Sequence, residues 1–208
     1  MPSPVDAALA DLVRVLTRLK VDWYLFGAQA AILYGSTRVT EDIDITIALG
    51  SLAPRDVVAA FEKRGFRLRV RDSAGFVDRT KVLPVVHTKS AIPVDVVFAG
   101  PGLEEEFMDR RKVIERRKLD LPVVSPEDLV VLKILAGRPH DYEDLRAVLR
   151  GVGAALDRAR VTSTLTALEH ALGQSDLLPA FARLTREARP RKKTAKAASS
   201  KRRGPTRK

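Results

Sequence analysis

Hydrophobic residues recur at helical spacing in some segments of this 208-residue chain and in short alternating or continuous runs in others, and from residue 129 onward the pattern is helical. Residues 5–20 carry leucine and valine at helical spacing, which predicts an amphipathic helix. Further helices are expected at 28–34 and at 54–64. Short apolar or alternating runs predict β-strands at 23–26, 41–49, 66–70, 82–87, 92–98 and 121–124.

The second part of the chain has a helical pattern. Ser125 is expected to be the N-cap of a helix with Pro126 in its first position, and two or three helices are expected from there to about residue 184. The predicted fold class is α+β, with a small mixed β-sheet flanked by helices and followed by a helical C-terminal part. The expected organisation is a core over 1–124, a helical part over 125–184 and a disordered basic tail over 185–208.

The net charge of +11 belongs to the C-terminal end of the chain. Residues 186–208 hold 11 lysines and arginines and one glutamate, whereas the other 185 residues hold 26 basic and 25 acidic side chains. This basic tail is interpreted either as an arm that raises affinity for RNA or DNA through counterion release, or as a solvated extension with incidental binding. No apolar run approaches the roughly 20 residues of a membrane span. A chain without cysteine or a signal-peptide pattern is expected to be cytoplasmic.

The first candidate chemistry is a pair of carboxylates, Asp42 and Asp44, in a run that alternates polar residues with isoleucine. Side chains two apart on a strand point to the same face, with Cβ atoms roughly 6–7 Å apart. Two carboxylates can hold divalent ions, and two ions about 3.5–4 Å apart form the clamp used by phosphoryl-transfer enzymes. A solvated strand face is the alternative.

Four further residues extend this pattern. Gly27 ends an apolar strand, and Ala28 begins the next helix, so the backbone N–H groups there favour a phosphate. Asp95 lies inside an apolar strand, which costs several kcal/mol unless the carboxylate is paired or bound to a metal. A structural salt bridge or an exposed edge strand would also explain Asp95. Arg38 either binds a phosphate or pairs with a carboxylate.

The order of these elements resembles the nucleotidyltransferase superfamily related to DNA polymerase β. Its motif is an apolar residue, Gly and then Gly or Ser, a gap of about a dozen residues, and an acidic-apolar-acidic strand. The closest resemblance is to the AbiEii-like abortive-infection toxins and their uncharacterised relatives, over roughly residues 21–150, and it rests on the segments Phe26–Gly35, Arg38–Asp44 and Lys133–Asp144. Ala28 departs from the motif and removes a hydroxyl contact to phosphate. A literal Gly-Ser at 35–36 lies too close to Asp42 for a helix between them.

The resemblance implies an NTP-dependent enzyme that transfers a nucleoside monophosphate to a hydroxyl and releases pyrophosphate. It implies two Mg²⁺ ions, replaceable by Mn²⁺, held by Asp42, Asp44 and Asp95, with Asp95 beside the other two and helping to deprotonate the acceptor. Lys133 would reach a nucleotide phosphate, although a solvated helix lysine has the same pattern. Asp141 and Asp144 would support the active site, although carboxylates are also favoured near helix N-termini.

The basic tail and the family resemblance also bear on the acceptor and the partners. The basic tail favours RNA, with tRNA 3′ ends as a target, and protein or small-molecule acceptors stay open. The resemblance also implies a toxin with an antitoxin partner. The alternative function is a catalytically inactive nucleotidyltransferase-fold module that binds nucleic acid or a protein partner.

Overall fold

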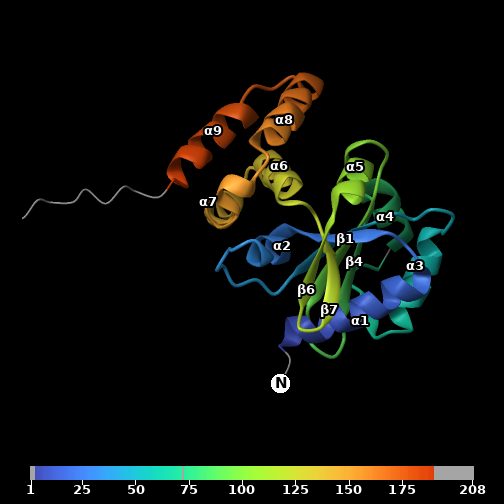
Figure 1. The fold of residues 1–208 in the computed structure, drawn as a ribbon. Helices are drawn as coiled ribbons and strands as arrows, with labels where there is room; N and C mark the ends of the chain where they lie inside the picture. The colour runs from blue at the N-terminus through green and yellow to red at the C-terminus, as the bar shows by residue number, and fades with distance from the viewer. Residues whose placement is uncertain (1–2, 72, 190–208) are drawn as a thin grey trace, which may run out of the picture.

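The computed structural model describes residues 3–71 and 73–189, and Figure 1 shows their fold. The helices are α1 (Pro4–Leu19), α2 (Gly27–Leu33), α3 (Pro54–Glu62), α4 (Ser73–Thr80), α5 (Leu103–Arg110), α6 (Pro126–Ala136), α7 (Pro139–Val152), the 3₁₀ turn η1 (Gly153–Ala155), α8 (Arg158–Leu172) and α9 (Leu177–Glu187). The strands are β1 (Trp23–Phe26), β2 (Ile43–Ile47), β3 (Phe66–Leu68), β4 (Val82–His87), β5 (Pro93–Phe98), β6 (Lys112–Arg116) and β7 (Leu119–Val123).

The strands form one mixed sheet in the order β3-β4-β5-β2-β1-β7-β6. The three central strands carry the chemistry: β2 pairs antiparallel with β1 and parallel with β5. Buried isoleucines, Ile43, Ile45 and Ile47, fix which face of β2 meets the core, because a slip of one residue would move them to the face that carries Asp44. The predicted α+β class with a mixed sheet flanked by helices is therefore confirmed.

The helices lie in two groups around the sheet. The apolar stripe of α1, which includes Leu9, Leu12 and Leu16, is fully buried, and α1 contacts α3. Figure 1 shows α6 to α9 gathered at the opposite end, beside α2, and α2 contacts both α6 and α7. This second group brings residues near position 140 to the ends of β1 and β2, where the carboxylates are.

The helix caps follow from local sequence. The Ser125 side chain accepts a hydrogen bond from the Asp128 backbone N–H at 3.2 Å, so α6 begins as predicted with Ser125 as N-cap and Pro126 after it. Gly137 has a φ of +64° and ends α6. Pro139 starts α7 two residues later. This close break makes four α-helices between residues 125 and 189, the last residue that the structure describes, so the expected two or three was wrong.

Three more expectations need correction. Asp42 lies one residue before β2 and not inside the strand. In the β2–β5 register Asp42 would pair with Pro93, which has no N–H to donate, so β2 begins at Ile43. The charged segments that form α4, α5 and β6 lack clear apolar periodicity and were not predicted. The helix α9 continues to Glu187, past the expected boundary at 184, because Leu184 and Ala188 are buried.

Residues 190–208 of the basic tail lie outside the described residues, so the expected disorder of this segment is untested. No helix within residues 3–71 and 73–189 is long and apolar enough to cross a membrane.

Candidate active site

At the end of β1, Gly27 lies in close contact with the Asp44 side chain of β2. Phe26 pairs with Asp44 across the β1–β2 ladder, and the chain then turns at Gly27 with a φ of +65°. A β-carbon on residue 27 would lie 2.0 Å from Asp44 Oδ2. Only glycine leaves room for that carboxylate and adopts this backbone without strain. Gly35, the alternative glycine, instead faces the backbone of Gly151.

The three aspartates lie at the same edge of the sheet. Asp44 on β2 pairs directly with Asp95 on β5, and side chains paired in this way point to the same face. Asp42, two residues before Asp44, is exposed and accepts a hydrogen bond from the Thr40 hydroxyl. The three carboxylates open onto one cavity of about 440 Å³, lined by Gly27, Ala28, Arg38, Asp42, Asp44, Asp95, Lys133, Arg138, His140 and Asp141.

Asp44 is partly buried and lies beside two other carboxylates. Burial, followed by repulsion from Asp42 and Asp95, raises the pKa of the Asp44 carboxyl to about 7, and Lys133 and Arg138 offset only part of this. No side chain in the described parts of the chain donates a hydrogen bond to the Asp44 carboxylate. Clustered carboxylates of this kind fit a divalent cation, since oxygen ligands and surplus negative charge are what Mg²⁺ and Mn²⁺ require.

The three carboxylates line one cavity, but they do not form a preformed metal-binding site. Across residues 3–71 and 73–189, no group of three or more histidine or acidic side chains is already arranged to hold a metal ion. Asp95 forms an ion pair with Arg69, and Asp42 is bonded to Thr40. The donor set therefore fits a divalent cation after side-chain rearrangement at these two positions.

A buried charged network lies behind the cavity. The Lys133 ammonium, 5% exposed, donates to Asp141 at 2.9 Å and to Asp144 at 2.7 Å, and both carboxylates are 1% exposed. Burial opposes ionisation of both aspartates, yet hydrogen bonds from cationic neighbours lower the pKa of each. The network is ionised and internally paired.

Each carboxylate of this network also holds an arginine at the cavity wall. Asp144 accepts from Arg38 at 3.3 Å and from the buried Ser36 hydroxyl at 2.8 Å. Asp141 accepts from Arg138 Nε at 2.7 Å. The hydrogen bond from Arg138 to Asp141 is the main cause of the raised pKa of Arg138, and the charges of Asp44 and Asp42 contribute. Two guanidinium groups are thus anchored beside the carboxylates.

The sequence over residues 4–170 matches a family described as nucleotidyltransferase of unknown function (DUF6036). The chain belongs to this family. It is therefore an enzyme of the class that transfers a nucleoside monophosphate from an NTP, and this class generally uses divalent metal ions. No curated protein sequence matches the chain. The likeness to abortive-infection toxins stays a prediction.

Solved structures of antibiotic-modifying enzymes share the fold of this nucleotidyltransferase. The lincosamide antibiotic adenylyltransferase LnuA with lincomycin bound is 16% identical, with a TM-score of 0.50, over 67% of this chain and 93% of that one. ANT(2")-Ia in complex with adenylyl-2"-tobramycin is 14% identical, with a TM-score of 0.55, over 80% of this chain and 97% of that one. At these identities the likeness shows the fold.

The structure brings together most residues that the sequence singled out in this nucleotidyltransferase. Eight of them line the cavity: Gly27, Ala28, Arg38, Asp42, Asp44, Asp95, Lys133 and Asp141. Asp144 lies behind it, held by Lys133 and Ser36. Arg38 shows the carboxylate pairing left open by the sequence. Lys133 is not a solvated helix lysine, because its ammonium is buried between two carboxylates. β5 is an interior strand, so the edge-strand explanation of Asp95 was wrong.

Sequence reasoning missed four residues near the site: Ser36, Arg69, Arg138 and His140. Arg138 and His140 flank Pro139. Recognising Pro139 as the first residue of a helix would have placed both at the N-terminus of α7. Arg69 follows the short strand β3 and reaches Asp95 across β4, a contact for which the sequence holds no signal.

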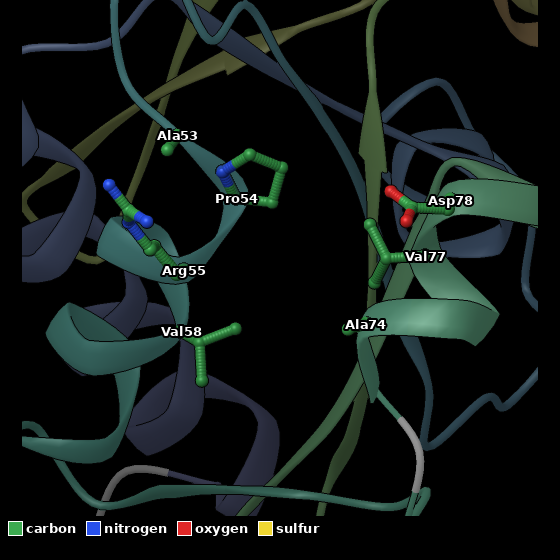
Figure 2. A pocket seen from close by; sticks show the side chains of 7 residues that line it. All are labelled: Ala53, Pro54, Arg55, Val58, Ala74, Val77 and Asp78. Carbon is green, nitrogen blue, oxygen red and sulfur yellow. The ribbon is translucent and has the colours of Figure 1, made fainter.

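A second cavity, of about 480 Å³, lies between α3 and α4. Figure 2 shows Arg55 and Val58 on one wall and Val77 and Asp78 on the other. Its lining is mostly apolar with a single acidic residue, which does not provide the paired carboxylates of group transfer.

Proposed function

We propose that this nucleotidyltransferase transfers a nucleoside monophosphate from an NTP to a hydroxyl of RNA, with tRNA as the favoured acceptor and Mg²⁺ as the working ion. The observation that carries the proposal is the pairing of Asp44 with Asp95 on adjacent parallel strands beside Gly27. One fold can host many functions, so the proposal rests on the residues of this cavity.

Asp42, Asp44 and Asp95 are the residues that would hold Mg²⁺, or Mn²⁺ in its place. When bound, two such ions neutralise the triphosphate and lower the pKa of the acceptor hydroxyl. Asp95, whose side chain is 42% exposed, takes the proton from the acceptor hydroxyl while the hydroxyl oxygen attacks the α-phosphorus. A new phosphorus–oxygen bond forms, the bond from the α-phosphorus to the bridging oxygen breaks, and pyrophosphate leaves.

Positive side chains bind the triphosphate in this scheme. Arg38 is anchored by Asp144 and Arg138 by Asp141, so both guanidinium groups are oriented before the substrate arrives. Arginine forks match phosphate oxygens, and pre-oriented charges cost little reorganisation during the reaction. Gly27 and Ala28 let the backbone of the β1–α2 turn approach the same phosphates. Lys133 does not contact the triphosphate in this scheme. It binds Asp141 and Asp144, the two carboxylates that orient the arginines.

The acceptor is inferred from charge. The tail carries most of the net charge of the chain, which favours a polyanion, and RNA carries the free hydroxyl that the reaction needs. The absence of cysteine fits a reducing cytoplasm. As a toxin, the enzyme would block growth by modifying RNA and would bind an antitoxin protein.

A labelling experiment tests the proposal. The protein is incubated with Mg²⁺, total RNA or purified tRNA, and each NTP labelled on either the α- or the γ-phosphate. We expect RNA to acquire α-label and no γ-label, with Asp44→Asn as the inactive control. Parallel reactions with lysate protein, lincomycin and tobramycin distinguish other acceptors, since the two antibiotics occur in the related structures. Labelling confined to one of these would overturn the RNA assignment, and no labelling anywhere would favour an inactive binding module.

The toxin role is tested separately by inducing the chain in a bacterial host. We expect growth to stop with the unmodified chain and to continue with Asp42→Asn at equal protein level. Equal arrest by both would contradict a toxin that acts through this site.

A further inference from the structure

Asp95 lies between two residues of opposite charge, Asp44 and Arg69. On the β2 side it pairs with Asp44. On the other side, Arg69 reaches across β4 and forms an ion pair with the Asp95 carboxylate. Arg69 therefore supplies the positive charge that balances the third carboxylate in this structure.

The position of Arg69 is set by strand β4. Its backbone N–H donates to Pro84 O at 3.0 Å, and its Nε donates to Val85 O at 3.1 Å. Pro84 is the residue of β4 that pairs with Asp95. With the backbone and Nε both held, the Nη2 atom is aimed at Asp95. The contact is thus built by three neighbouring strand segments.

Arg69 also explains why the carboxylates do not form a finished ion site. Asp95 lines the 440 Å³ cavity with Asp42 and Asp44, but Arg69 does not. The ion pair engages the Asp95 carboxylate with a residue outside the cavity lining, and no group of three or more histidine or acidic side chains in the described chain is arranged to hold a metal. The pair is accessible, with Arg69 36% and Asp95 42% exposed. Exposed ion pairs are weak and are easily exchanged.

We propose that Arg69 is a positioning residue that competes with the divalent cation for Asp95. This inference rests on the proposed metal site. Ion binding by Asp42 and Asp44 turns Asp95 away from Arg69, and loss of the ion returns Asp95 to the arginine. The arginine thereby keeps three neighbouring carboxylates tolerable when no ion is bound, and it lowers the affinity for the ion.

The test measures Mn²⁺ binding directly, from the electron paramagnetic resonance signal of the free ion, without NTP turnover. Arg69→Gln removes the competitor, and the Mn²⁺ dissociation constant is expected to fall by about two- to five-fold, the range set by a weak exposed pair. Arg67→Gln is the matched control: it removes the same charge from β3 two residues away, at an exposed position. No change is expected for Arg67→Gln. A dissociation constant for Arg69→Gln equal to or above that of Arg67→Gln overturns the proposal.

A second comparison separates competition from a general loss of positive charge. In an Asp95→Asn background, Arg69→Gln is expected to leave Mn²⁺ affinity unchanged, because the contested carboxylate is gone. A tightening of similar size with and without Asp95 overturns the proposal. If Arg69→Gln does not fold, Arg69→Lys is used, because lysine keeps the charge but lacks the guanidinium fork whose Nε and Nη2 bond Val85 and Asp95. A fall in its dissociation constant supports competition, and an unchanged value opposes it.

Two outcomes of Mn²⁺ binding separate a wrong role for Arg69 from a wrong metal site. Mn²⁺ binding that requires Asp44 but ignores Arg69 would overturn the role of Arg69 alone. Absence of Mn²⁺ binding in every variant, with and without a non-hydrolysable NTP analogue, would overturn the metal site and the competition together.

Discussion

Gly27 and Asp44 approach so closely that a β-carbon at position 27 would lie 2.0 Å from Asp44 Oδ2. The glycine adopts a φ of +65° at the end of β1, and the aspartate faces it from β2. This contact joins the glycine turn to the strand that carries Asp44, and it leaves no room for a side chain at position 27.

Gly27→Ala is expected to lower transfer by about 100-fold or more, since displacing a catalytic carboxylate by even 1 Å costs about that factor. Gly173→Ala is the matched control, because Gly173 has a φ of +66° with nothing within 4 Å of an added β-carbon. The free energy of unfolding of each variant should fall by about 1 kcal/mol or more, because alanine is strained in the left-handed backbone conformation. Only Gly27→Ala should lose activity. Equal activity in the two variants, measured by α-label transfer, would contradict the close contact.

Asp42→Asn is expected to abolish transfer while the fold stays intact, because Asp42 is exposed and contributes little to packing. Loss of one carboxylate from the metal site weakens binding of the cation that neutralises the reacting phosphates, and should cost about 100-fold or more in rate. Turnover and circular dichroism are measured on the same preparation. Mg²⁺-dependent transfer retained by this variant would count against the catalytic role of the carboxylates.

The stability of the ion-free protein should depend on pH through Asp44. Burial, and then Asp42 and Asp95, raise its pKa to about 7. Between about pH 4, the usual value for an unfolded aspartate, and pH 7, the folded state holds a proton that the unfolded state has released. The free energy of unfolding therefore falls as pH rises through this window.

Asp44→Asn removes this penalty, so with chelator present it should be more stable than the unmodified protein at pH 8, with a smaller difference at pH 4. Urea unfolding at both values provides the measurement. Asp109→Asn, at an exposed position, should show no such trend. A stability difference that shrinks as pH rises would show that Asp44 is not the group responsible.

Lys133→Met should destabilise the fold by about 3 kcal/mol, the low end for breaking a buried ion pair. The low end applies because Asp141 keeps Arg138 and Asp144 keeps Arg38 after the lysine is removed. Arg146→Met is the comparison: its pair with Glu187 is about one-third exposed or more at each end and should cost under about 1 kcal/mol. Similar losses in urea unfolding would mean that the Lys133 network is energetically ordinary.

Deleting residues 190–208 removes nine lysines and arginines and should weaken RNA binding without changing turnover at saturating RNA. For every RNA phosphate that the tail neutralises, the deletion should reduce the slope of log affinity against log salt by about 0.7–0.9. A variant with the same tail residues in shuffled order should keep the original slope. An unchanged slope after deletion would show that the tail does not bind RNA.

The site was predictable from sequence where it depends on neighbours along the chain. Strand period predicted that Asp42 and Asp44 share a face, and both line the cavity although Asp42 lies one residue before β2. The motif spacing selected Gly27 over Gly35, and Gly27 is the glycine that contacts Asp44. Helix capping placed the start of α6 at Ser125 and Pro126. These features are local, because φ, side-chain direction and caps are decided within a few residues.

Contacts between distant segments were decided only by the tertiary structure. The register of β2 with β5 sets Asp95 beside Asp44, and the packing of α6 and α7 against α2 buries Lys133 between Asp141 and Asp144. Arg69 meets Asp95 only because β3 and β4 are neighbours in the sheet. The sequence by itself determined which residues carry the charges; folding decided which charges meet, because sheet order and helix packing depend on the whole core.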